Sequence, residues 1–135
     1  MTILCRKRLL SLFSLGLLAF LMLQPALYPQ TTADETLTKK YEKILGRYEF
    51  DLSSLGADIQ IFNFYIQQGA FWVDYGFTSP GEMKPVGDSS EEFTFVDPDD
   101  GPVKITFIKD EEGQYTKCRC VCEGVGLDVV GNKIK

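Results

Sequence analysis

The feature that most constrains this chain is an alternation of apolar and polar side chains with a period of two, which begins near residue 47. In the segment "RYEFDL", Tyr48, Phe50 and Leu52 fall on one side of an extended chain, and the charged residues fall on the other. The segment "PVKITFIKD" repeats the pattern further along. Successive side chains of a β-strand point to opposite faces, so this period predicts strands with one buried face.

Turn-forming residues divide the alternating region into short segments. The loops "QQG", "TSPG", "DPDDG" and "DEEGQ" are rich in residues that favour tight turns. We count eight short strands, a spacing typical of an antiparallel barrel or sandwich. The predicted fold is mainly β: an antiparallel eight-stranded up-and-down barrel with a short N-terminal helix. Leu37, Tyr41 and Ile44 share one face of that helix.

The chain opens with a basic stretch followed by an apolar one. Three basic residues precede an uncharged run from Leu9 to Leu23. A helix over that run would reach only ~22 Å, short of the ~30 Å hydrocarbon core of a bilayer. We therefore expect residues 1–33 to be a secretory signal peptide, with export to the bacterial periplasm or the cell exterior, and residues 34–135 to form one β-barrel domain. The alternative is an uncleaved anchor over residues 9–28, which would hold the protein at the inner membrane.

Charge and composition exclude several classes of function. All 19 acidic residues follow Ala33, whereas three of the 14 basic residues precede it, so the predicted domain has a net charge of −8. A negative surface repels phosphate backbones and anionic lipid headgroups, and we expect no nucleic-acid partner and no membrane binding by the cleaved domain. The chain contains no histidine. This excludes Ser-His and Cys-His nucleophile pairs and the usual histidine-bearing catalytic zinc site.

The segment "YTKCRCVCEG" places Cys118, Cys120 and Cys122 at alternating positions. Neighbouring same-face residues of a strand lie ~6.6 Å apart, too far for a disulfide bond without breaking the strand. We predict that the three cysteines act as small apolar core residues, with Cys122 the most accessible of them. A metal site with a carboxylate as fourth ligand, and a redox or disulfide role involving a neighbouring strand, are the alternatives.

Two acidic segments are candidates for chemistry. "DPDDG" holds Asp97, Asp99 and Asp100 but lacks the glycine and glutamate spacing of an EF-hand calcium loop, so a tight turn is the preferred explanation. In "FWVDYG", Asp74 lies on the same side of the strand as Trp72, where it is either a pocket carboxylate or a solvent-facing residue. No spacing marks a pair of carboxylates for glycoside chemistry. We expect neither a metal nor another cofactor.

Residues 37–135 carry several turn and core motifs of a known kind of domain. They include "ILGRYEF", the "MKPVGDSSEEFTF" hairpin, and "ITFIKDEEGQYTKCRCVCEG" followed by "GNKIK". In these motifs the chain resembles the small lipocalin-like C-terminal β-barrel domain of unknown function that is appended to serine hydrolases of the β-lactamase and penicillin-binding-protein class. Asp110 and Gly113 match the last hairpin of that family, and Lys133 and Ile134 match its closing pair. The Ser-x-x-Lys motif of those hydrolases is missing here, so the resemblance implies a fold and no catalytic residues.

Taken together, these observations favour an exported, non-catalytic barrel that binds a small apolar ligand or a protein or peptide partner. The resemblance implies a separately encoded serine hydrolase as a natural partner. Small barrels either fill their interior or hold one small ligand. The alternatives are a hydrolase-like enzyme that works through carboxylates and a structural envelope protein held by an uncleaved anchor. The candidate ligand-binding residues of the barrel interior are Ile61, Phe71, Asp74, Phe93 and Phe107.

Overall fold

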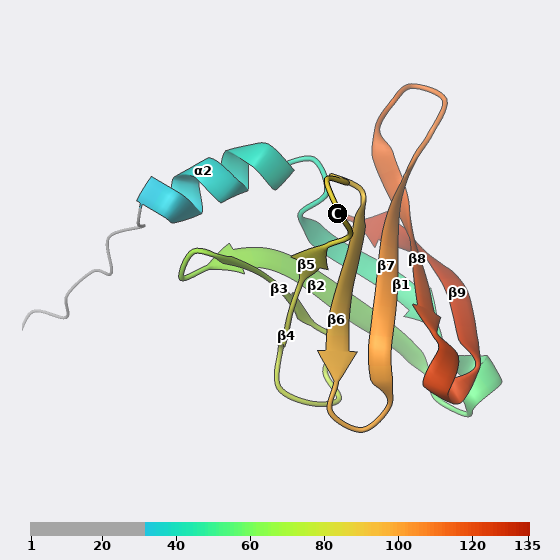
Figure 1. Ribbon diagram of the computed structural model, residues 1–135. Coiled ribbons are helices and arrows are strands. Elements are labelled where there is room, and N and C mark those ends of the chain that lie inside the picture. The colour runs from blue at the N-terminus through green and yellow to red at the C-terminus, as the bar shows by residue number, and fades with distance from the viewer. Residues whose placement is uncertain (1–31) are drawn as a thin grey trace, which may run out of the picture.

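The computed structural model describes residues 32–135 of the chain (Figure 1). The predicted signal peptide and the alternative anchor over residues 9–28 therefore lie outside the described residues, except that Thr32 and Ala33 belong to the first helix. Within residues 32–135, no helix is both long enough and apolar enough to cross a bilayer.

One helix, two short 3-10 turns and nine strands make up the described chain. In chain order they are α2 (Thr32–Tyr41), β1 (Gly46–Asp51), η1 (Ser53–Leu55), β2 (Ile59–Gln67), β3 (Ala70–Asp74), β4 (Gly81–Glu82), β5 (Lys84–Pro85), β6 (Glu92–Asp97), β7 (Gly101–Lys109), β8 (Tyr115–Cys122), η2 (Glu123–Val125) and β9 (Leu127–Ile134).

The nine strands form one antiparallel sheet that curves into a nearly closed barrel (Figure 1). Its strand order is β4-β3-β2-β1-β9-β8-β7-β6-β5. Strands that follow one another in the chain are paired, except for β4 and β5 at the two edges, and the first and last strands, β1 and β9, pair with each other. The two edge strands, β4 and β5, are separated in the sequence by the single residue Met83. The predicted up-and-down barrel with a short N-terminal helix is confirmed.

The expected count of eight strands becomes nine because a short strand, β4, forms just before Met83 in a segment that was expected to be a turn. Gly81–Glu82 pairs with β3, whereas Lys84–Pro85 pairs with β6 on the other side of the gap. The amide of Met83 still donates to the carbonyl oxygen of Phe71 at 2.8 Å. Pro85 has no amide hydrogen with which to extend a ladder, which suits it to this short edge segment.

Aromatic side chains fill the half of the barrel next to α2. Tyr41, at the end of the helix, stacks on Phe71 with ring centroids 5.2 Å apart and meets the edge of Phe93 at 5.4 Å. Phe107 lies among these rings, 5.0 Å from Phe64 and 5.9 Å from Phe93. Tyr41, the buried residue of α2, thereby packs into this end of the barrel. We call this group the aromatic cluster; its members are Tyr41, Tyr48, Phe64, Phe71, Phe93 and Phe107.

Candidate functional site: an apolar cavity at the open end of the barrel

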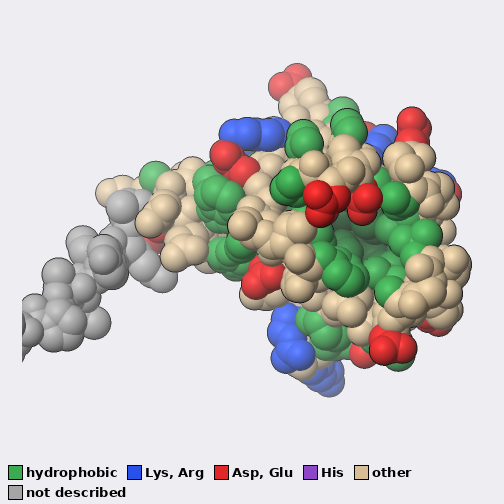
Figure 2. All heavy atoms as spheres, turned by 90° about the horizontal axis from the view of Figure 1, so that it is seen from below, with side chains coloured by type: hydrophobic (Ala, Val, Ile, Leu, Met, Phe, Trp, Pro, Cys, Tyr) green, Lys and Arg blue, Asp and Glu red, His purple; other side chains and the backbone are tan. Residues whose placement is uncertain are grey.

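The end of the barrel away from α2 holds a cavity of about 370 Å³. Seen from below, the molecule is hollowed there, with hydrophobic side chains inside and acidic side chains at the mouth (Figure 2). Its wall is drawn from β2, β6–β9, both 3-10 turns and the connections that follow β1, η1, β3 and β6. The lining residues are Leu52, Leu55, Ala57, Phe62, Tyr75, Phe77, Thr78, Phe95, Asp97, Asp99, Asp100, Val103, Cys120, Cys122, Val125 and Leu127.

Side-chain size along two paired strands explains why one half of the barrel is filled and the other is hollow. On β7 the inward residues shrink toward the open end, from Phe107 through Ile105 to Val103. Their partners on β8 are all cysteines, and Val103 lies opposite Cys122. Two small residues therefore lie side by side in the wall here, where a phenylalanine stands beside a cysteine at the filled end, and the barrel interior in front of them stays open.

The two 3-10 turns set the shape of the mouth. Each ends at a glycine in the left-handed region, Gly56 with φ 74° and Gly126 with φ 66°. Glycine adopts this conformation without the steric cost that a Cβ brings. The turns place Leu55 and Val125 at the rim, where 45% and 37% of their surfaces are exposed. The mouth is consequently edged with apolar side chains.

Aromatic rings form one wall of the cavity around Tyr75. The ring of Tyr75 has its centroid 5.2 Å from that of Phe95, 5.6 Å from Phe62 and 6.2 Å from Phe77. Tyr75 is buried, whereas Phe77 is 54% exposed at the rim. A ligand that enters the cavity would thus meet aromatic carbon on this side.

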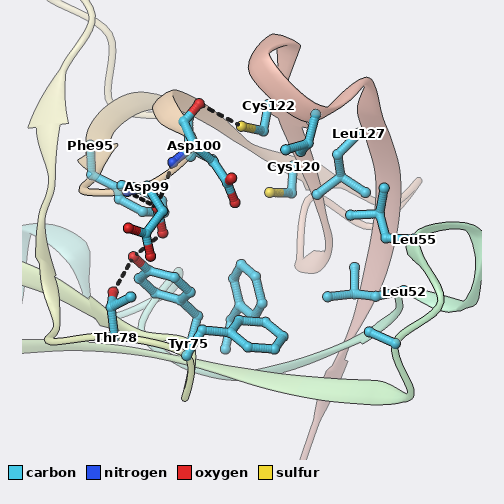
Figure 3. A pocket seen from close by; sticks show the side chains of 16 residues that line it. Leu52, Leu55, Tyr75, Thr78, Phe95, Asp99, Asp100, Cys120, Cys122 and Leu127 are labelled. Carbon is cyan, nitrogen blue, oxygen red and sulfur yellow. Dashed lines mark hydrogen bonds between the residues drawn. The ribbon is translucent and has the colours of Figure 1, made fainter.

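Asp97 anchors the turn between β6 and β7, whose residues Asp99 and Asp100 lie at the edge of the cavity (Figure 3). Its Oδ1 accepts the amides of Asp99 at 2.8 Å and Asp100 at 2.9 Å, and its Oδ2 accepts the hydroxyl of Tyr75 at 2.6 Å. The Tyr75 hydroxyl also lies 2.7 Å from Oγ1 of Thr78. The tight-turn interpretation of "DPDDG" is therefore confirmed, and the turn is joined to β3 through Tyr75.

The ionisation of this pair follows from burial and these hydrogen bonds. Burial works against the charged form of Asp97, but the hydrogen bonds from Tyr75 and the two amides outweigh it and lower the pKa of the carboxyl. Burial, followed by the hydrogen bond to Asp97, raises the pKa of Tyr75 to about 12. At neutral pH the pair is a carboxylate and a neutral phenol.

Cys120 and Cys122 face the cavity, and all three cysteines of β8 are buried, as the core prediction requires. The Sγ of Cys122 lies 3.7 Å from the carbonyl oxygen of Asp100, to which it donates. Burial is the main cause that raises the pKa of the Cys120 thiol to about 12, and it raises the pKa of Cys118 as well. The three thiols are free.

These positions predict an order of alkylation. Cys122, at the mouth, is expected to react with iodoacetamide before Cys120 and Cys118. The latter two should react at least about a hundredfold more slowly in the native protein than in urea, because a raised pKa depletes the reactive thiolate. A time course of peptide mapping by mass spectrometry at pH 8 measures each site. Equal native rates at all three cysteines would contradict this placement.

The residues predicted from sequence to bind a ligand do not line the cavity. Phe71, Phe93 and Phe107 are buried in the barrel interior, but they belong to the aromatic cluster at the other end. The expectation that Ile61 and Asp74 face the interior was wrong. Ile61 is half-buried on the outer face of β2, opposite Glu49, because its neighbours Phe62 and Phe64 point inward.

Asp74 is exposed at the end of β3, where its Oδ1 accepts the amide of Gly76 at 3.1 Å. Trp72, on the same face, is half-buried and donates to the carbonyl oxygen of Gln67. The solvent-facing interpretation of this acid is the one that the structure supports.

Sequence reasoning missed that the turn "DPDDG" and Tyr75 line the cavity. The available signal was the decrease in side-chain size from Phe107 to Val103, together with cysteines on the strand that follows. Within residues 32–135, no group of three or more cysteine, aspartate or glutamate side chains is arranged to hold a metal ion.

Comparison with family models, with curated proteins and with solved structures finds no match for this chain. The resemblance to the barrel domain of serine hydrolases therefore stays a prediction.

Proposed function

We propose that the barrel binds one small, largely apolar ligand in the cavity at its open end and has no catalytic role. The observation that carries this proposal is the cavity itself: about 370 Å³, enclosed by apolar and aromatic side chains with a few polar groups at one edge. Sites for small molecules commonly have volumes of about 300–1,000 Å³ and this kind of lining. Leu55, Phe77 and Val125 extend the apolar surface outward around the mouth.

The alternative of a carboxylate-based hydrolase has less support from the geometry. A general acid needs a raised pKa, whereas that of Asp97 is lowered, and both oxygens of Asp97 accept hydrogen bonds within its own turn and from Tyr75. Asp97 is accordingly a structural carboxylate in this proposal. Export and a protein or peptide partner, such as a serine hydrolase, stay predictions.

Filling the cavity tests the proposal. Val103→Phe places a large side chain in the cavity beside Cys122, and Val130→Phe makes the same change on the outer face of β9. We expect Val103→Phe to weaken binding of the neutral fluorescent probe N-phenylnaphthylamine by at least about tenfold, which corresponds to ~1.4 kcal/mol. Val130→Phe should bind the probe like the unmodified protein.

The melting temperature of each ligand-free variant shows whether the barrel still folds. If Val103→Phe does not fold, Ala57→Phe at the half-buried edge of the mouth takes its place. The proposal fails if the unmodified protein does not bind the probe, or if a folded cavity-filling variant binds it undiminished.

A further inference from the structure

We infer that the ligand of this cavity is an organic cation, with an apolar body inside the barrel and an ammonium group held at the acidic edge of the mouth. This inference rests on the proposed function, because it names the class of ligand for the same cavity. Two independent features carry it: the sign of the charges at the mouth and the aromatic wall beside them.

The charges at the mouth are all negative. Asp97, Asp99 and Asp100 line the cavity, and in the part of the chain that the structure describes no lysine or arginine lines it. Asp99 and Asp100 are exposed, and Figure 3 shows the side chain of Asp100 extending over the cavity on the side of Cys120. Among residues 32–135, the ion pairs lie elsewhere and involve other acids: Glu82, Glu91, Glu92 and Asp128.

Asp97 adds a buried negative charge to the mouth, and no lysine or arginine among the described residues that line the cavity balances it. Its carboxylate is only 6% exposed and is stabilised by the Tyr75 hydroxyl and two amides rather than by a positive side chain. A carboxylate in a partly apolar cavity interacts more strongly with a nearby ion than it does in water. An anionic headgroup would therefore be repelled from this mouth, and a cationic one attracted.

The aromatic wall suits the same class of ligand. The faces of tyrosine and phenylalanine rings attract organic cations, and quaternary ammonium ligands are often held this way. Tyr75, Phe62, Phe77 and Phe95 form such a group directly beside the acidic turn. The rest of the wall includes Leu52, Val103 and Leu127, which offer aliphatic contacts and so suit an alkyl body.

A matched series of ligands tests the charge of the headgroup. We expect octyltrimethylammonium to bind at least about tenfold more tightly than octanol by calorimetry, and octanoate to bind least. Added salt should weaken the binding of octyltrimethylammonium but not that of octanol or octanoate, because salt screens the exposed carboxylates. Octanol binding as tightly as the cation would overturn the inference while leaving the proposed function intact. A chain that binds none of the three would overturn both.

A matched pair of variants tests the site of recognition. The double variant Asp99→Asn with Asp100→Asn removes two charges at the mouth and keeps the two amides that bind Asp97. Glu111→Gln with Glu112→Gln removes the same charge from the exposed hairpin between β7 and β8, at the other end of β7 from the DPDDG turn. We expect the Asp99/Asp100 variant to bind octyltrimethylammonium about tenfold more weakly and octanol with unchanged affinity. The Glu111/Glu112 variant should bind both ligands like the unmodified protein. Equal effects of the two pairs would show a general attraction to an acidic protein and overturn the inference.

Discussion

Replacing Phe107 by alanine is expected to lower the free energy of unfolding by about 3–5 kcal/mol, the usual cost of removing a buried phenylalanine side chain. Phe107 belongs to the aromatic cluster and lies on β7, which pairs with β6 on one side and β8 on the other. Only 1% of its surface is exposed. Its ring lies 5.0 Å from that of Phe64 and 5.6 Å from that of Tyr48. Its partner on β8 is Cys118, which is too small to occupy the space that the substitution leaves.

Urea unfolding followed by tryptophan fluorescence measures this loss, and Phe77→Ala provides the control. Phe77 is 54% exposed at the mouth of the cavity, so its removal should change stability by only about 0.5 kcal/mol. Similar losses for the two variants would mean that the two halves of the barrel are packed alike. That result would contradict the division into a filled half and a hollow half.

Alternation of side chains predicted the strands well where one face is apolar and the other is polar. In "RYEFDL" the inward set of Tyr48, Phe50 and Leu52 is the buried set in the structure. In "DIQIFNFYIQ" both faces are largely apolar, so the pattern does not say which face is buried. Ile61 was consequently expected inside, whereas Phe62 occupies the interior.

The cavity was harder to predict than the barrel because it depends on which residues share a level of the barrel. Phe71, Phe93 and Phe107 are the large inward residues that a sequence draws attention to, and they are the ones that fill space. The open half is made by small residues such as Val103 and Cys122, which become neighbours only through the β7–β8 register. Periodicity shows which residues point inward, but it does not show which of them lie opposite one another.

The turn "DPDDG" shows a similar limit. Its composition predicted a tight turn, and Asp97 forms one with the amides of Asp99 and Asp100. The contact with Tyr75 joins residues 22 positions apart in the sequence and depends on barrel closure across β4 and β6. This contact turns a local turn residue into part of the cavity wall, and no local pattern indicates it.

Asp97→Ala is expected to destabilise the protein by about 2–3 kcal/mol at pH 7, because two amides and the Tyr75 hydroxyl lose a charged acceptor in a buried place. Asp97→Asn, which retains an oxygen acceptor of the same shape, should cost less. Urea unfolding measures both variants. A loss for Asp97→Ala no larger than that for Asp97→Asn would show that the turn does not need this acceptor.

Repeating the urea unfolding of the unmodified protein and of Asp97→Ala at several pH values isolates the contribution of the Asp97 charge. The pKa of Asp97 is lowered in the folded protein, so the folded state binds fewer protons than the unfolded chain over the acid range. Its ionised form therefore adds stability above the usual carboxyl range, and this contribution disappears as the pH falls through the lowered pKa. The stability difference between unmodified protein and Asp97→Ala should shrink steadily from pH 6 toward pH 2. Asp51, Glu91 and Asp128, whose pKa values are also lowered, are present in both chains and cancel in the difference. A difference that stayed constant over this range would mean that Asp97 acts through the shape of its side chain alone, and the acidic mouth would then rest on Asp99 and Asp100.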